Sequence, residues 1–280
     1  MSSLAPIAPG ELRVDVAADA AGRTRVTSLR QRYPQRVTAP LHCDPDHPNS
    51  AVLCVQSPSG GAFSDDDLHT TVHCGAGTHL QLTTQAATQV FAGDGPGARH
   101  QLRFTVSSDA VLEYQPKTVI PQSDSTFTQR LDLDVDPSGI YLGWEAVAAG
   151  RIAHGERFRY AGYDNAFAVT IAGRTIARDR HVIRPAHTAC GPALVDGDYV
   201  ATFLAVLPGR AAGPVLHRVR AVLDELPGIH GGAGELPGGS GVIVRITTRR
   251  APELHRARQA LHGAARTEFL SPATTYGRSA

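Results

Sequence analysis

The chain has 280 residues, 42% of them hydrophobic, which is enough to bury a sizeable core in one large domain spanning residues 1–280. Its 27 Lys and Arg residues are balanced by 26 Asp and Glu residues, so the net charge of +1 provides no global field for nucleic acid or anionic lipid. The N-terminal stretch lacks a basic n-region and an apolar h-region, and no segment approaches the ~18 apolar residues of a membrane span. We therefore expect a cytoplasmic protein with no nucleic-acid or membrane partner.

Residues 11–206 consist of short apolar alternations separated by Gly, Pro, Asp and Ser, a pattern that predicts many β-strands joined by turns. In the clearest case Leu131, Leu133 and Val135 alternate with three aspartates and precede a Pro-Ser-Gly turn. The same alternation occurs near residues 80–82, 102–106, 167–171 and 242–246. Helical periodicity is nearly absent from this part of the chain.

Helical spacing of apolar residues occurs in two C-terminal segments, 215–226 and 252–270, and predicts a helix in each. The intervening segment 227–241 contains seven glycines and two prolines, so we expect a mobile loop there. The fold class is therefore all-β with two C-terminal helices. The strands can form stacked layers, a β-helix-like array or a sandwich, and periodicity alone does not separate these arrangements.

Nucleotide-binding and nucleophile motifs are missing. The sequence has no GxxxxGK[ST] and no strand followed by GxGxxG, and the glycines of 93–97 are interrupted by a proline without a following helical pattern. A GxSxG elbow is missing too. We expect no tightly bound cofactor and no catalytic residue.

Two clusters combine acidic, imidazole and thiol groups, one at residues 42–47 and one at residues 65–74. In a strand, His69 and His73 face the same side while Cys74 faces the other, so one strand cannot direct all three to a metal. Each cluster is either a solvated acidic turn leading into a strand, or a weak, exchangeable site for a borderline cation.

Paired carboxylates suggest an alternative function, an all-β hydrolase acting on a polar substrate. Such an enzyme needs two acids roughly 5–10 Å apart across a cleft. Glu145 and Glu156 are the candidates by elimination. Aromatic residues make up only 6% of the chain and Trp144 is its sole tryptophan, which argues against a sugar-binding cleft.

Four spaced motifs resemble those of the D-type urease accessory proteins (UreD, also called UreH). Gly60-Gly61 with Asp66 and Leu68 is similar to the GGxxxGDxL element of that family, and residues 82–88 (LTTQAAT) are similar to LTTxxAT. Residues 112–116 (LEYQP) with Ile120-Pro121 resemble LEYLPxPxIP. Gly150-Arg151 with residues 155–158 (GERF) resembles GRxxxGExF.

The resemblance covers about residues 29–207 and, more loosely, the C-terminal strand and helices. Three positions depart from the motifs: Asp65 replaces a glycine, Gln89 replaces a basic residue that often follows LTTxxAT, and Gln115 replaces a leucine. The turn at Asp65 therefore cannot use the freedom of glycine at positive φ.

Membership of this family implies a maturation factor for nickel urease and not an enzyme. The implied partners are the urease apoprotein, the F-type accessory protein and the G-type GTPase, so GTP is the ligand of a partner. For this family a water-filled internal tunnel is the proposed nickel route. The resemblance suggests Asp66, Thr84, Glu145 and Glu156 as groups that line the path of a nickel ion in transit. A scaffold of this kind also predicts apolar partner surface on the two C-terminal helices.

Strand alternation, if it extends through 155–158, places Glu156 and Phe158 on one face and Arg157 on the other. With Phe158 packed inward, the carboxylate of Glu156 would be carried toward the interior.

Overall fold

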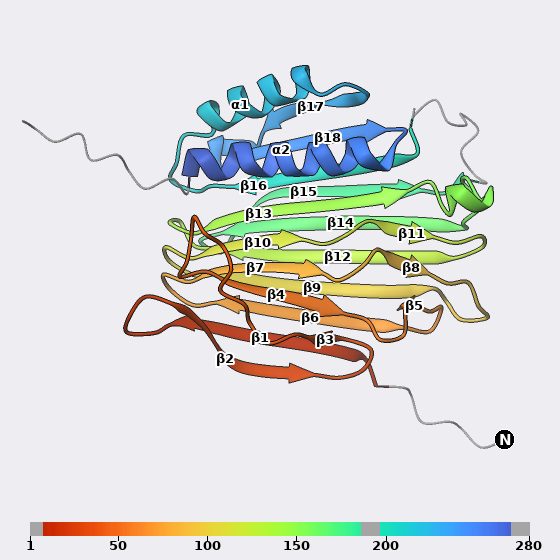
Figure 1. The fold of residues 1–280 in the computed structure, drawn as a ribbon, viewed down its shortest axis with the longest axis horizontal. Helices are drawn as coiled ribbons and strands as arrows, with labels where there is room; N and C mark the ends of the chain where they lie inside the picture. The colour runs from red at the N-terminus through yellow and green to blue at the C-terminus, as the bar shows by residue number, and fades with distance from the viewer. Residues whose placement is uncertain (1–7, 186–196, 270–280) are drawn as a thin grey trace, which may run out of the picture.

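The computed structural model describes residues 8–185 and 197–269, which form two sheets with a shared core and α-helices near the C-terminal end (Figure 1). Within these ranges sheet A has seven strands. In spatial order they are β15 (Arg174–Ile183), β14 (Gly162–Ile171), β12 (Thr126–Val135), β9 (Ala98–Val106), β6 (Asp67–Cys74), β1 (Gly10–Ala18) and β2 (Thr24–Gln31).

Sheet B lies on the other side of the core from sheet A. Its main path runs through β17 (Ile229–Glu235), β18 (Gly241–Thr248), β16 (Tyr199–Val206), β13 (Ile140–Ala148), β10 (Val111–Gln115), β7 (His79–Thr84), β4 (Ala51–Gln56) and β3 (Arg36–Val37). Further short strands join it at one end, namely β5 (Gly61–Ala62), β8 (Thr88–Val90) and β11 (Val119–Pro121).

The chain winds as a β-solenoid from β6 to β14. The first two turns pass through sheet A, sheet B and then a short strand: β6, β7 and β8, followed by β9, β10 and β11. In the third turn, β12 and β13 are followed by the short helix η1 (Ile152–His154). Neighbouring strands within each sheet are therefore parallel over this region. Antiparallel pairs extend the stack, with β1 and β2 at one end and β16, β18 and β17 at the other. The prediction of an all-β fold with stacked strands and two C-terminal helices is confirmed.

The core between the sheets is made by the inward-facing residues of the alternating strands. In β12, for example, Leu131 and Leu133 are buried while Asp132 and Asp134 are exposed, as the sequence pattern predicts. Because the side-chain period of a strand is two, every solenoid turn adds one inward row to the same core.

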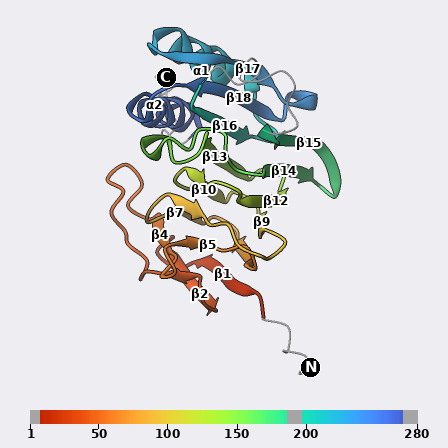
Figure 2. The same ribbon diagram turned by 90° about the vertical axis from the view of Figure 1, so that its right-hand side faces the viewer.

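A second core lies on the outer face of sheet B, under α1 (Ala212–Glu225) and α2 (Ala251–Phe269) (Figure 2). Trp144 and Phe203 of the sheet share this core with Val215 of α1 and with Leu254 and Leu261 of α2. The apolar faces of the helices are thus buried within the chain, so the prediction that they form a partner surface is wrong.

The Gly-rich segment 227–241 is not the loop that its composition predicts. Its residues Ile229–Glu235 form β17, which pairs with β18, and Pro237–Gly239 form the short helix η4. A Cβ at Gly231 would lie 2.2 Å from the carbonyl oxygen of Arg245, so glycine permits a close backbone approach here. The ladder with β18 offsets the conformational entropy that favours a loop.

None of the helices in the described ranges combines the length and apolar character needed to cross a membrane.

Candidate functional site

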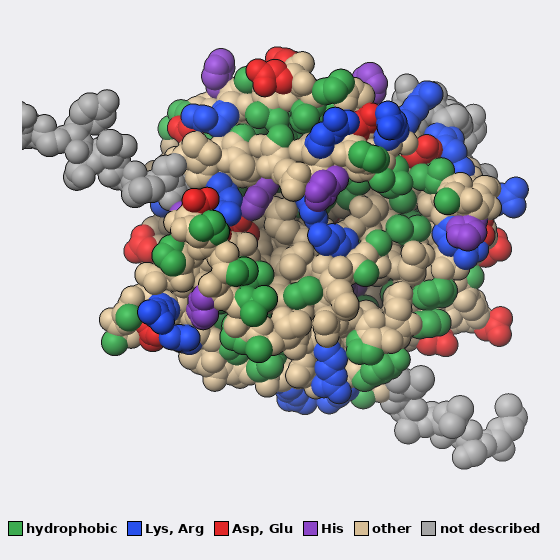
Figure 3. Space-filling view, viewed as in Figure 1, with side chains coloured by type: hydrophobic (Ala, Val, Ile, Leu, Met, Phe, Trp, Pro, Cys, Tyr) green, Lys and Arg blue, Asp and Glu red, His purple; other side chains and the backbone are tan. Residues whose placement is uncertain are grey.

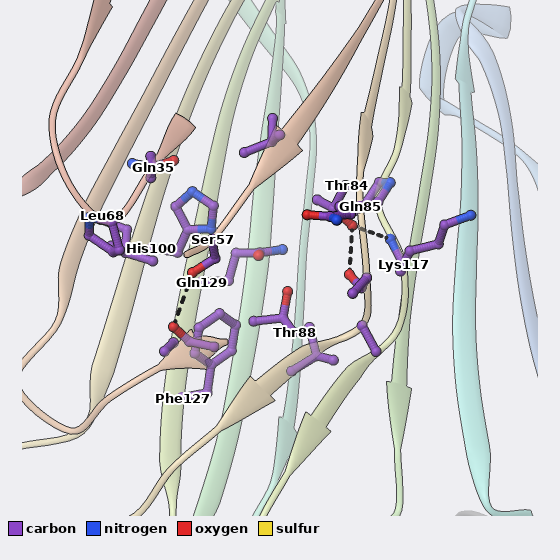
Figure 4. A pocket seen from close by; sticks show the side chains of 18 of the residues that line it. Gln35, Ser57, Leu68, Thr84, Gln85, Thr88, His100, Lys117, Phe127 and Gln129 are labelled. Atoms are coloured by element: carbon purple, nitrogen blue, oxygen red, sulfur yellow. Dashed lines mark hydrogen bonds between the residues drawn. The ribbon is translucent and has the colours of Figure 1, made fainter. Parts of the chain in front are cut away.

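A cavity of about 130 Å³ lies between sheets A and B, and Figure 4 shows the side chains around it. Apolar groups such as Leu68 and Phe127 form part of its wall. Its polar groups include Thr84, His100, Gln129 and Glu145, and among the described residues Glu145 is the single carboxylate of the lining.

The cavity residues His100 and Gln129 belong to one register across the solenoid, which continues to Asn165 beyond the cavity lining. In sheet A, Leu68, His100, Gln129 and Asn165 are successive backbone partners of β6, β9, β12 and β14. All four point inward, because they share the parity of the buried apolar residues on their strands. Three successive solenoid turns therefore place polar side chains, those of His100, Gln129 and Asn165, at inward positions that are otherwise apolar.

Glu145 faces this row from β13 of sheet B. Its Oε1 accepts a hydrogen bond from Nε2 of Gln129 at 2.7 Å, and its Oε2 accepts one from Nδ2 of Asn165 at 2.5 Å. Burial raises the pKa of Glu145, and these two bonds offset part of that increase. The carboxyl group is therefore shifted toward its neutral form unless a cation compensates its charge.

His100 places a neutral imidazole in the same row. Burial lowers the pKa of its imidazole to about 4, with a smaller contribution from the nearby charge of His69. Its Nε2 lies 2.9 Å from the hydroxyl oxygen of Thr70, and that hydroxyl donates to Oε1 of Gln35 at 2.6 Å. The side chain of Gln35 donates in turn to the backbone carbonyls of Gly10 and His69, which fixes its orientation.

Thr84 ends β7 at the wall of the cavity. Its hydroxyl donates to the carbonyl of Ala86 at 3.1 Å and accepts from the backbone N–H of Lys117 at 2.9 Å, as the dashed lines of Figure 4 show. The side chain thus joins two connections that border the cavity, and the structure brings Thr84 and Glu145 to the same space.

Asp66 lies outside the cavity lining and closes a turn. Its Oδ2 accepts a hydrogen bond from the backbone N–H of Phe63 at 2.8 Å, and its own N–H donates to the carbonyl of Phe63. The preceding residue, Asp65, is not among the residues with positive φ, so its replacement of glycine causes no left-handed strain. The side chain of Asp65 instead occupies the space beside Gly95, where an added Cβ would lie 1.9 Å from its Oδ1.

Glu156 also lies outside the cavity lining, and the predicted strand through 155–158 does not form. The short helix η1 (Ile152–His154) and a turn occupy this part of the chain, so strand alternation does not apply. Both carboxylate oxygens of Glu156 bind the guanidinium of Arg151, and Oε2 accepts from the N–H of Ser123. The Arg151 bonds lower the pKa of Glu156 to about 2, which keeps the carboxylate charged.

Replacement of Glu156 by Gln is expected to weaken this loop rather than the cavity. The amide keeps the shape but loses the charge-assisted pair with Arg151. We expect protease cleavage within residues 150–160 to become faster, while the core stays intact. His154→Gln in the same loop, at an exposed side chain, is the control. Equal cleavage rates in Glu156→Gln and the control would contradict this assignment.

The two clusters that combine acids with imidazoles do not converge on a metal. Asp44 pairs with Arg266, while His69 and His73 lie 3.4 and 3.9 Å from Asp67 and Asp15, respectively. Cys74 is buried in the core, as the alternation predicts. Across residues 8–185 and 197–269, no group of three or more His, Cys, Asp or Glu side chains is arranged to hold a metal ion.

A second buried carboxylate, Glu113, lies on the opposite face of sheet B under α2. Its two oxygens are each 2.5 Å from an imidazole nitrogen, Nε2 of His79 and Nε2 of His262, and its side chain is fully buried. Arg266 lies 3.5 Å from Glu113 and 2.5 Å from Asp44. This network joins β10, β7, the 38–50 connection and α2, and it was not predicted from the sequence.

The hydrolase alternative needs two acids in one cleft. Glu145 lies in the cavity, whereas Glu156 is held by Arg151 away from the cavity lining. The paired-carboxylate geometry is therefore not formed by these two residues.

His100, Gln129 and Asn165 were not predicted from the sequence either. The available signal is a polar residue at an inward position of an alternating strand, as in Ala98-x-His100-x-Leu102 and Phe127-x-Gln129-x-Leu131. A buried polar side chain requires a hydrogen-bond partner, so such a residue marks either a network or a ligand site.

Comparisons with known proteins identify the family. The family model of the UreD urease accessory protein matches residues 8–279. A urease accessory protein UreD from Mycolicibacterium gilvum is 62% identical over 94% of this chain and 96% of the relative. UreD of Deinococcus radiodurans is 31% identical over 85% of this chain and 84% of the relative, and UreD 2 of Streptomyces griseus is 29% identical over 94% and 92%. The chain belongs to the UreD family of urease accessory proteins.

Proposed function

We propose that this chain delivers nickel to apo-urease in the cytoplasm, as a non-catalytic scaffold between apo-urease and a complex of the F-type accessory protein with the G-type GTPase. Family membership supports the role in urease assembly. The nickel passage and the individual partners follow from the family resemblance. GTP hydrolysis belongs to the G-type partner.

One observation carries the proposed passage: the carboxylate of Glu145 meets neutral oxygen and nitrogen groups in a cavity between the sheets. Nickel accepts both imidazole and oxygen ligands. A charged ligand among neutral ones suits a cation that must bind and then leave. Because burial favours the protonated form of Glu145, an entering cation competes with a proton for this carboxylate.

Thr84 belongs to the same proposed path, since its hydroxyl lies at the cavity wall. A nickel role for Asp66 and Glu156 stays a prediction. Their carboxylates are occupied by a turn and by Arg151, so such a role requires these contacts to open.

The test is Glu145→Gln, expressed together with the urease subunits and the other accessory proteins. We expect the complex to assemble and the nickel content of urease to fall on the order of 10-fold, the lower end of the loss in metal affinity or activity seen when a group that supports a metal ligand is mutated. Metal analysis of purified urease and co-purification of the complex are the measurements. Asp134→Asn, an exposed carboxylate on β12, is the matched control. Full nickel loading by Glu145→Gln, or loss of assembly, would reject the passage through this residue.

A further inference from the structure

Lys117 is the sole lysine of the chain. All other Lys and Arg positions are arginine. Lys117 lies in the connection between β10 and β11 and lines two spaces. One is the cavity already described. The other is a pocket on the outer side of sheet B, next to α2, which adjoins the cavity and shares Gln85, Ala86 and Ala87 with it.

This outer pocket has a volume of about 290 Å³. Apolar groups form much of its wall, among them Ala86, Ala87, Trp144 and Leu254. Lys117 and Arg258 supply its positive charge. On the face drawn in Figure 3, basic and histidine side chains border a hollow just below α2.

Neither cation of this pocket has an acidic partner among residues 8–185 and 197–269. In these ranges the side chain of Arg258 contacts Nδ1 of His255 at 3.4 Å, and Lys117 bonds only through its backbone N–H. Arg266, eight residues further along α2, shows the contrast, because it contacts the carboxylates of both Asp44 and Glu113. The two arginines share one face of the helix, but within the described part of the chain only Arg266 is neutralised.

The charged forms of both groups are disfavoured where they lie. Burial lowers the pKa of Lys117, and the like charge of Arg258 lowers it further. Burial also lowers the pKa of Arg258. Partly buried charges are normally paired, since removal from water is costly without a counter-charge. A negatively charged ligand between them would remove both penalties.

We propose that this pocket binds an oxyanion, with the ammonium of Lys117 and the guanidinium of Arg258 as its donors and Trp144 with Leu254 as its apolar wall. Carboxylate and phosphate groups share the required chemistry, because each presents several acceptor oxygens to a planar guanidinium and a point-like ammonium. The anion is either free in solution or the carboxylate of an acidic peptide segment. The proposal does not depend on nickel passage.

The single lysine allows a selective test on the full chain, alone or in its complex. Brief acylation with an amine-reactive ester, followed by peptide mass spectrometry, compares the rate at Lys117 with the rate at the N-terminal amine of the same molecule. The probes are inorganic phosphate, acetate and a glutamate-rich octapeptide, each against chloride at equal ionic strength. With an anion that the pocket binds, we expect acylation of Lys117 to be several-fold slower than in chloride. The rate at the N-terminal amine should not change.

The probes separate the two sources of the anion. Protection by phosphate or acetate identifies a free anion, and protection by the peptide alone identifies a polypeptide carboxylate. Arg258→Met is expected to abolish the protection, whereas Arg256→Met, at an exposed residue of the same helix, keeps it. Trp144 is the sole tryptophan and lines the pocket, so its fluorescence emission measures anion binding independently. Equal rates at Lys117 with every probe, together with unchanged emission, would overturn the proposal.

Discussion

Replacement of Glu113 by Ala is expected to destabilise the chain by about 3–5 kcal/mol, the range found when one partner of a buried ion pair is removed. The fully buried carboxylate contacts His79, His262 and Arg266, so its loss leaves their polar nitrogens without this acceptor. Thermal unfolding should shift down by roughly 10 °C for a chain of this size. Because His262 and Arg266 belong to α2, that helix should lose protection from hydrogen exchange first.

The contribution of Glu113 also predicts a pH dependence. Burial acts to raise its pKa, but the adjacent imidazoles of His262 and His79 outweigh burial and lower the pKa from 4.5 to about 2. A lowered pKa in the folded state stabilises the fold above the unfolded value, and this stabilisation is lost as the pH falls from about 4.5 to about 2. The difference between wild type and Glu113→Ala should therefore shrink over this range. Glu235→Ala, at an exposed residue of β17, is the control, and an equal shift in both variants would contradict the network.

Replacement of Gly150 by Ala is expected to cost about 3–5 kcal/mol, from backbone strain and overpacking together. Gly150 has a φ of 122°, and an added Cβ would lie 2.1 Å from the carbonyl oxygen of Glu156. These contacts explain why Gly150, Arg151 and Glu156 of the GRxxxGExF motif occur together. Gly150 admits the backbone of Glu156, and Arg151 then binds the carboxylate of the same residue.

Gly155→Ala is the matched control for Gly150→Ala. Gly155 has a φ of 73°, but an added Cβ there would meet no other atom of the described residues within 4 Å. The expected cost is therefore about 1–2 kcal/mol, that of the left-handed backbone alone. Denaturant unfolding measures both variants. Equal losses would show that the close contact with Glu156 does not matter.

The strand content could be predicted because alternation is a local property. The buried and exposed residues of β12 follow from the period-two pattern of 126–135, and the two C-terminal helices follow from their own spacing. The four motifs likewise indicated the UreD family, since each is a short run of neighbouring residues. Their physical roles were less accessible: Glu156 faces Arg151 because η1 interrupts the strand pattern, which no apolar alternation signals.

Local patterns were thus sufficient for the strand-rich class, the two helices and the urease accessory family, whereas the residues that meet in space depend on tertiary contacts. Parallel solenoid turns bring His100, Gln129 and Asn165 into one register opposite Glu145, although these residues are widely spaced in the chain. The Gly-rich segment becomes β17 because β18 supplies its backbone partners. Both outcomes depend on hydrogen bonds between distant segments, and a local pattern carries no information about the partner that satisfies them.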